Sequence, residues 1–206
     1  MERGGSHRAD GETPSALHAP PSPSTDAKPS IGARLSVAVD DLSFFGSDAI
    51  ARPVTAELGA TTPLGRRLEV AALDGDRGER LTAQLRRSEP LAVGSAVVTG
   101  AGALQVELLV HAVVQSDTER VTRDSVSRAT ASALQRAEAF GVRHLAMSPF
   151  GTGAGNLDVD DAAQVMVEAI VRHLASSPLP ERVTVVVESE HEREAFASRI
   201  AWIASA

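Results

Sequence analysis

Cysteine is absent from this 206-residue chain, and aromatic residues make up only 3% of it, with no tyrosine and a single tryptophan, Trp202. The lack of cysteine excludes disulfides, thiolate metal sites and cysteine nucleophiles, and it is compatible with a reducing compartment. Hydrophobic residues make up 43% of the chain. A core of ordinary size must therefore be built from Val, Leu, Ile and Ala.

Long apolar runs and an excess of basic charge are also missing. No run reaches the roughly 18 apolar residues that a membrane span requires. Residues 1–30 have no apolar stretch of the kind found in secretory signals. The net charge is −7, whereas binders of nucleic acid or membrane surfaces carry a concentrated basic face. The sequence predicts a soluble, cytoplasmic protein with no membrane partner and no general affinity for nucleic acid.

The first 33 residues differ in composition from the rest of the chain. They contain five of the eleven prolines and almost no bulky apolar side chains. Such a segment cannot bury enough surface to offset the entropy lost on ordering. The sequence therefore predicts a disordered tail over residues 1–33 and one folded domain over residues 34–206. The PPSPS stretch of the tail is typical of a solvated linker, and a recognition site for a protein partner is the alternative.

The folded part alternates between β-type and helical patterns. Strands are predicted at 35–39, 48–54 (ended or bent by Pro53), 94–104, 106–114, 144–150 and 182–189, the last of them buried within the sheet. Helices are predicted within 63–88, in one or two pieces, and at 124–140, 159–176 and 192–205. Gly141 stands at the expected stop of one helix and Asp158 at the N-cap of the next. This alternation predicts an α/β fold whose mostly parallel sheet is covered on both faces.

A glycine-rich loop separates the predicted strand at 144–150 from the helix at 159–176. Its sequence, SPFGTGAGNLDV, places Gly151, Gly153 and Gly155 at alternate positions. Glycine lets the backbone approach a ligand closely, most often a phosphate at a helix N-terminus. A tight strand-to-helix turn is the other explanation. Ligands of parallel sheets bind at the carboxyl ends of the strands, which is where this loop is expected.

In order and spacing, the elements over residues 35–200 resemble the macrodomain, an α/β/α module that binds ADP-ribose. GSAVVTGAGAL and LLVHAVV are similar to the middle strands of that family. HLAMSPFGTGAGNLDVDDAAQVMVEAIVRHL is similar to its strand, diphosphate-binding loop and following helix, and RVTVVVES and EREAF to its last strand and helix. The resemblance implies a three-layer α/β/α fold with a mixed, mostly parallel sheet. It also implies ADP-ribose or a related adenine nucleotide as the ligand, with no cofactor.

The resemblance further implies which residues contact the nucleotide. Asp41 corresponds to the Asp that accepts a hydrogen bond from the adenine amino group, and a carboxylate is a suitable acceptor for an amine. Apart from the resemblance, an Asp turn that ends a strand explains Asp41 equally well. The residues implied to bind the ligand are Asp41, Leu42, Thr55, Ser148, Gly151, Thr152, Gly153, Ala154, Gly155 and Asn156.

Three positions depart from the family pattern. Where the family reads D-A-I-V-N-A-A-N, this chain reads DAIARPVT, so Thr55 replaces the Asn that holds the distal ribose and serves hydrolysis in active members. ELGATTPLG replaces a GGG loop, and its Pro63 has no amide to offer a phosphate. Gly155 stands where an aromatic side chain often packs on the distal ribose. The departures concern the distal ribose and hydrolysis, whereas the adenine side and the second diphosphate loop are better preserved.

Three functions are compatible with this pattern, and no catalytic residue is predicted. The favoured one is a module that binds ADP-ribose or a related nucleotide without turning it over. The second is an ADP-ribosyl hydrolase that uses a water positioned by the diphosphate, because the usual Asn is not at position 55. The third is a degenerate macro-like domain that serves protein–protein contacts.

Other polar residues have simpler explanations. His111 lies in the apolar run VELLVHAVV and is predicted to be a hydrogen-bonded core residue. Asp158 is predicted to cap a helix, with Asp160 and Asp161 on its solvated face. A metal site built from these three carboxylates is disfavoured because the spacing shows no fourth ligand, so no metal is predicted. No G-x-S-x-G motif supports Ser/His/Asp catalysis.

Overall fold

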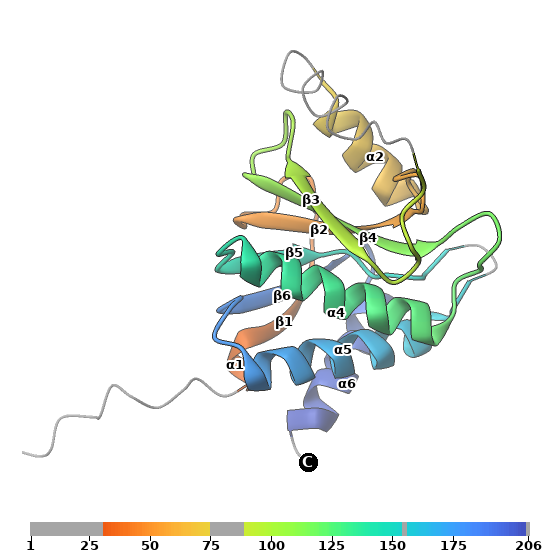
Figure 1. The fold of residues 1–206 in the computed structure, drawn as a ribbon. Helices are drawn as coiled ribbons and strands as arrows, with labels where there is room; N and C mark the ends of the chain where they lie inside the picture. Colours follow the sequence, from red (N-terminus) through yellow and green to blue (C-terminus); the bar gives the residue numbers. More distant parts are fainter. Residues whose placement is uncertain (1–30, 75–88, 154–155, 205–206) are drawn as a thin grey trace, which may run out of the picture.

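A six-stranded sheet with the order β1-β6-β5-β2-β4-β3 forms the centre of the computed structural model, which describes residues 31–74, 89–153 and 156–204 (Figure 1). Neighbouring strands are parallel except for β3, which is antiparallel to β4. The strands are β1 (Leu35–Val39), β2 (Ala49–Thr55), β3 (Ala96–Gly100), β4 (Leu108–Gln115), β5 (His144–Met147) and β6 (Arg182–Val187). The predicted α/β fold with a mixed, mostly parallel sheet is confirmed.

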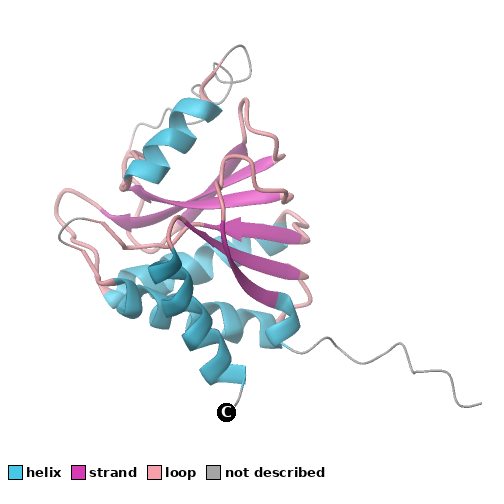
Figure 2. Ribbon diagram, turned by 180° about the vertical axis from the view of Figure 1, so that it is seen from behind, coloured by secondary structure: helices cyan, strands magenta, loops and turns pink. Residues whose placement is uncertain are grey.

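Helices cover both faces of this sheet. They are α1 (Ile31–Arg34), α2 (Pro63–Ala72), α4 (Arg123–Ala139), α5 (Val159–Ser176) and α6 (Glu190–Ala204). Helices α4, α5 and α6 lie on one side of the sheet and α2 lies on the other (Figures 1 and 2). The result is the three-layer arrangement that the sequence predicts.

Successive residues of a strand point to opposite faces, so each face of the sheet has its own core. In β2, Ala49 and Ala51 belong to the core formed with α4, α5 and α6. Ile50 lies between them in the sequence and packs instead with Leu64 and Leu68 of α2. All five side chains are at most 6% exposed. Continuous apolar runs are therefore needed in the inner strands, because both faces are buried.

Local hydrogen bonds determine where the two long helices begin and end. Helix α4 starts with a capping box, in which the side chains of Thr122 and Ser125 each accept the other's backbone amide at 3.0 Å. It ends before Gly141, whose φ of +72° suits glycine. Helix α5 starts after Asp158, whose Oδ1 accepts from the Asp161 amide at 2.8 Å. The predicted helix stop and N-cap are confirmed.

Pro53 lies inside β2 and does not end it, which excludes one of the two effects predicted for it. Strand β5 pairs with β2 only as far as Met147, opposite Ala51, whose carbonyl also accepts from the Ser148 amide at 3.2 Å. Alternate residues of a strand direct their backbone groups to the same side, so Pro53 faces the space beyond the end of β5. No described strand there requires the amide hydrogen that proline lacks. The Pro53 carbonyl accepts instead from the Thr61 hydroxyl at 3.3 Å.

Two predictions lie partly outside the described residues. Of the tail predicted over 1–33, residues 1–30 are not described, and the last three belong to α1. Of the helical segment predicted within 63–88, α2 is confirmed, whereas residues 75–88 are not described. Within the described ranges, no helix has the length and apolar character needed to cross a membrane.

Candidate functional site

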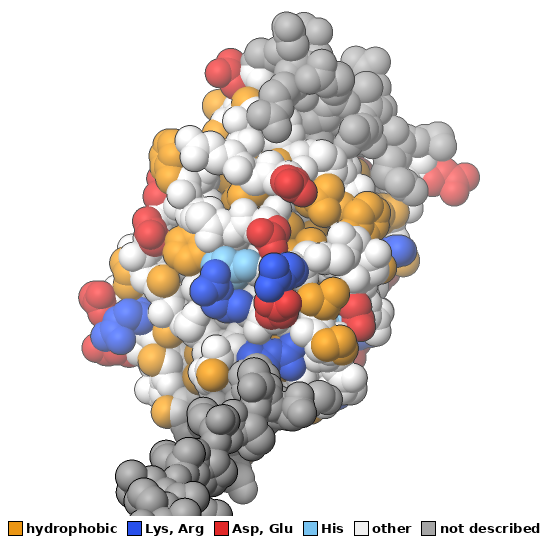
Figure 3. All heavy atoms as spheres, turned by 90° about the vertical axis from the view of Figure 1, so that its left-hand side faces the viewer, with side chains coloured by type: hydrophobic (Ala, Val, Ile, Leu, Met, Phe, Trp, Pro, Cys, Tyr) orange, Lys and Arg blue, Asp and Glu red, His pale blue; other side chains and the backbone are white. Residues whose placement is uncertain are grey.

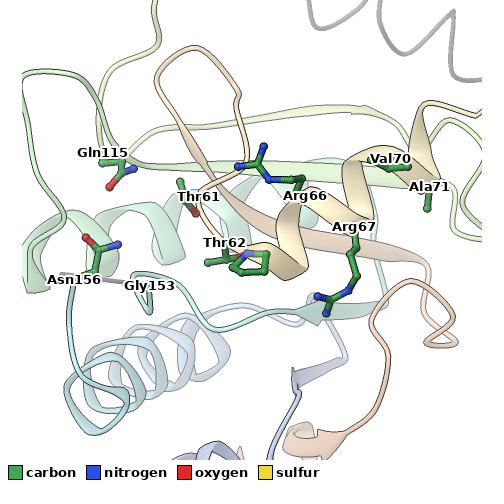
Figure 4. A pocket seen from close by; sticks show the side chains of 10 residues that line it. Thr61, Thr62, Arg66, Arg67, Val70, Ala71, Gln115, Gly153 and Asn156 are labelled. Carbon is green, nitrogen blue, oxygen red and sulfur yellow. The ribbon is translucent and has the colours of Figure 1, made fainter.

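A cavity of about 810 Å³ lies at the carboxyl edge of the sheet, between α2 and the loop that follows β5 (Figure 4). The described residues that line it are Thr61, Thr62, Pro63, Arg66, Arg67, Val70, Ala71, Gln115, Gly153 and Asn156. Two of these are arginines and none is acidic, although the whole chain has a net charge of −7. Positive charge is therefore concentrated at this cavity, which suits an anionic ligand.

The first turn of α2 forms one wall of the cavity. Thr62 is the N-cap, and its Oγ1 accepts from the Gly65 amide at 3.0 Å. Pro63 follows in the first turn, where backbone amides have no acceptor within the helix. Because α2 begins at the cavity, the positive end of its dipole adds to the charge of Arg66 and Arg67. The segment that replaces the GGG loop thus borders the cavity with a helix N-terminus and two threonines.

The glycine loop forms the opposite wall, and its two described glycines meet different requirements. Gly151 has a φ of +78°, and a Cβ there would lie 2.5 Å from Cγ2 of Val126 in α4. Gly153 lines the cavity, and a Cβ there would lie 3.1 Å from Nδ2 of Asn156. Gly151 therefore lets the loop pack against α4, while Gly153 keeps the wall of the cavity open. The third glycine, Gly155, lies outside the described residues together with Ala154.

Asp41 lies in the turn after β1 and is not among the cavity-lining residues. Its side chain is exposed, and its Oδ1 accepts from the Ser43 amide at 2.9 Å. A carboxylate accepts several hydrogen bonds, so this turn leaves Asp41 with capacity for a ligand donor. Leu42 is fully buried with Ile50 and Leu64, so only its backbone is available to a ligand.

Thr55, at the end of β2, is engaged in a turn. Its Oγ1 accepts from the Gly59 amide at 3.2 Å, and its own amide donates to the Gly59 carbonyl at 2.9 Å. Ser148 is 2% exposed, and Thr152 is half-buried. Of the predicted residues that the structure describes, Gly153 and Asn156 line the cavity.

Arg52 supports the site from inside the sheet, a role that the sequence analysis does not predict. It is 1% exposed, and its Nε donates to Nδ1 of His111 at 3.1 Å. Its other nitrogens donate to the carbonyls of Leu58 at 3.3 Å and Gly65 at 3.5 Å, and Glu69 lies 3.7 Å away. Burial lowers the pKa of Arg52, and Glu69 opposes that shift. Arg52 thus connects β2, by hydrogen bonds, to the loop before α2 and to the first turn of this helix. The sequence signal that could have identified Arg52 is its charge within an otherwise apolar strand.

His111 is a core residue, as predicted. It is fully buried, and its Nε2 lies 2.8 Å from Oγ1 of Thr99, which in turn donates to the Gly100 carbonyl at 2.9 Å. Burial, together with the neighbouring Arg52, lowers the pKa of His111 to about 3. The neutral ring therefore accepts from Arg52 at Nδ1 and donates to Thr99 at Nε2.

Arg67 connects the cavity with the end of β6. Its guanidinium pairs with Glu188, the residue that follows this strand. The end of β6 adjoins the turn that holds Asp41, because the Asp40 amide donates to the Val187 carbonyl at 3.1 Å. Both side chains of the ion pair are about half exposed, so the pair contributes little stability and Arg67 can leave it at little cost.

A second cavity, of about 490 Å³, lies at the opposite edge of the sheet, where acidic and basic side chains gather beside a histidine (Figure 3). Arg143 pairs with Glu181 at 2.9 Å, and Arg182 donates to Nδ1 of His144 at 3.0 Å. Burial and Arg182 lower the pKa of His144. The lining contains two carboxylates, Asp48 and Glu181, beside its arginines, so this cavity is less suited to an anion than the first. Across the described ranges, no three His, Asp or Glu side chains lie close enough to hold a metal ion.

The fold is that of solved macrodomains. A mutant of the Oceanobacillus iheyensis macrodomain with ADPR aligns with a TM-score of 0.72 at 17% identity, covering 84% of this chain and 94% of that one. The Trypanosoma brucei macrodomain in complex with ADP-ribose aligns with a TM-score of 0.69 at 15% identity, covering 80% and 68%. Residues 70–166 match the family model described as Macro domain. The chain contains a macro domain.

Sequence relatives of this macro domain chain include an uncharacterized protein of Mycobacterium tuberculosis. It is 33% identical over 130 residues, which are 63% of this chain and 36% of the relative. An O-acetyl-ADP-ribose deacetylase of an Enterobacter species is 32% identical over 107 residues, which are 51% of this chain and 59% of that enzyme. The matched region thus spans little more than a third of the mycobacterial relative.

Proposed function

We propose that this macro domain binds ADP-ribose or a related adenine nucleotide and does not turn it over. The observation that carries the proposal is the cavity between α2 and the glycine loop. It holds Arg66, Arg67 and a helix N-terminus, and the described lining contains no acidic side chain. A nucleoside diphosphate carries the negative charge that such a cavity attracts.

The proposed ligand extends along the carboxyl edge of the sheet. Its diphosphate lies between Gly153 and the first turn of α2. Its adenine lies toward Asp41, past the ion pair of Arg67 with Glu188, and its distal sugar lies toward the opposite end of the cavity. The two solved macrodomains with ADPR or ADP-ribose support this class of ligand.

Binding without turnover is favoured by what the site contains. Thr55 stands at the position of the family's hydrolytic Asn, and its hydroxyl is engaged by the Gly59 amide. The described lining includes no Asp, Glu or His that could act as a general base toward a water. The second candidate function, hydrolysis of an ADP-ribose-linked bond, is favoured by the Enterobacter relative that is named a deacetylase. Release of acetate from O-acetyl-ADP-ribose, compared with a reaction lacking protein, distinguishes the two.

Gly153→Glu tests the diphosphate position. By calorimetric titration, we expect the full chain to bind ADP-ribose in the micromolar range and the variant to bind at least about 30-fold more weakly. A carboxylate near the diphosphate costs about 2 kcal/mol at the dielectric of a protein surface, which corresponds to that change in affinity.

The matched control for this variant is Gly46→Glu. Gly46 is exposed, and a Cβ there meets nothing within 4 Å, so the same charge is added without crowding the fold. We expect its affinity to stay within about twofold of the original protein. An equal loss in both variants would contradict the diphosphate position. No measurable heat with the original protein, together with no thermal shift at millimolar ligand, would favour protein–protein contacts as the function.

Asp41→Asn tests the adenine position while preserving the turn, since the Asn side chain also accepts from the Ser43 amide. We expect the original protein to prefer ADP-ribose over its hypoxanthine analogue, whose carbonyl replaces the adenine amine, by about tenfold. The variant should reduce this preference, because an amide can donate to that carbonyl. Asp40→Asn is the matched control and should keep the preference. An unchanged preference in Asp41→Asn would mean that Asp41 serves only the turn.

A further inference from the structure

Gln115 stands where the strand pairing of β2 and β4 is irregular. Val54 pairs with Val113, but the next residue, Thr55, pairs with Gln115, so that Val114 has no partner in β2. Such a β-bulge changes the direction of the side chains that follow it, and bulges are frequent beside binding sites. Here the bulge brings Gln115 of β4 level with the end of β2. The Gln115 carbonyl accepts from the Ala56 amide at 2.9 Å, which holds this end of β4 in place.

The side chain of Gln115 lines the cavity, whereas its partner in the register, Thr55, does not. Asn156 lines the cavity from the glycine loop, close to Gly153. Figure 4 shows both carboxamides at the same end of the cavity, away from Val70 and Ala71. The cavity thus ends between two neutral carboxamides, one from β4 and one from the loop.

Each carboxamide offers an acceptor oxygen and two donor hydrogens. Vicinal hydroxyls of a sugar each donate and accept, so a pair of carboxamides can satisfy them without a net charge. The two arginines lie farther along α2 and suit phosphates instead. The chemistry of the cavity therefore changes along its length, from cationic at α2 to neutral and polar at Gln115.

We propose that Gln115, together with Asn156, binds the hydroxyls of the sugar beyond the diphosphate and so determines the preference of this site for ADP-ribose over ADP. This inference rests on the proposed nucleotide binding and assigns a residue to its distal end. Gln115 takes over, from the neighbouring strand, the carboxamide contact that Thr55 does not supply.

The test compares two ligands that differ only beyond the diphosphate. Calorimetric titrations of the full chain with ADP-ribose and with ADP would be repeated for Gln115→Met, which keeps the length of the side chain and removes the carboxamide. We expect the variant to bind ADP-ribose about 3- to 10-fold more weakly and ADP within about twofold of the original protein, as for loss of one neutral hydrogen-bonded group. Gln135→Met, on the exposed surface of α4, is the matched control and should change neither affinity.

Each other outcome overturns the inference in a distinguishable way. Equal weakening of ADP-ribose and ADP would place the effect of Gln115 on the diphosphate or on the fold. Unchanged ADP-ribose affinity would mean that Gln115 does not contact the sugar. If the original protein binds ADP as tightly as ADP-ribose, the distal end contributes no selectivity. If it binds neither ligand, the proposed nucleotide binding fails, and this inference fails with it.

Discussion

Replacing Arg52 with methionine will lower the free energy of unfolding by about 3 kcal/mol. Methionine fills much of the same space but donates no hydrogen bond, so Nδ1 of His111 and the Leu58 carbonyl both lose a donor. A buried polar group left without a partner costs about 1–3 kcal/mol. In a domain of this size, the expected loss lowers the melting temperature by about 6–12 °C. Thermal and denaturant unfolding, followed by circular dichroism, measure the change.

Arg67→Met is the matched control, because it makes the same substitution at an exposed ion pair in α2. Its pairing with Glu188 is about half exposed, so we expect a loss within about 1 kcal/mol. A second variant, Arg52→Met with His111→Leu, removes the unsatisfied acceptor at the same time and should recover part of the stability. If Arg52→Met unfolds at the same denaturant concentration as the original protein, the segment from Leu58 to Gly65 is held without the guanidinium.

The same network explains how a threonine-rich segment can replace a glycine loop at this cavity. Leu58 has a left-handed backbone with a φ of +69°, and its carbonyl accepts from Arg52. A leucine in that region is strained, and such strain persists only where surrounding contacts hold it. Arg52 supplies one of these contacts from inside the sheet. The wall of the cavity at α2 is therefore fixed by hydrogen bonds from a buried cation and does not depend on the conformational freedom of glycine.

Gly151→Ala will destabilise the protein by about 3 kcal/mol and weaken ADP-ribose binding by at least about tenfold. The left-handed backbone at φ +78° costs about 1–2 kcal/mol for a residue with a Cβ. The added methyl would also lie 2.5 Å from Cγ2 of Val126, which forces a shift of the loop or of α4. Because Gly153 follows two residues later, that shift moves the wall of the cavity. Denaturant unfolding and calorimetric titration measure the two effects.

Gly141→Ala separates the cost of the backbone from the cost of the contact. Gly141 has nearly the same φ, +72°, but a Cβ there meets nothing within 4 Å. We expect this variant to lose only about 1 kcal/mol and to bind ADP-ribose as the original protein does. Equal destabilisation by the two substitutions would show that the Val126 side chain moves away from the added methyl at no cost in stability. The loop would then not be tightly packed against α4.

Much of the fold was predictable because its signals are local. Gly141 and Asp158 act within a few residues of the helix ends that they define, through a left-handed backbone and a side-chain cap. The apolar runs of β1 and β6 needed no partner to be recognised as strands. The effect of Pro53 on β2 depends on where β5 ends, and the sequence of a single strand does not contain that information.

The site was less predictable, because its residues come from different strands and loops. Gly153 and Asn156 were identified through the glycine loop, and both line the cavity. The adenine role of Asp41 remains a prediction. Arg52 and Gln115 were not identified, since each gains its role from a neighbour distant in the sequence.

The sequence by itself determined the order of strands and helices, the layered α/β architecture and the position of the glycine loop. These follow from hydrophobic period, capping and turn chemistry, which act over a few residues. Only the tertiary structure decided that Thr55 is engaged with Gly59, that Arg52 holds the wall of the cavity, and that a bulge between β2 and β4 brings Gln115 to its end. Those outcomes depend on the register and packing of segments that are distant in the sequence. The hydrogen bonds and contacts that stabilise them form only when these segments come together in the fold.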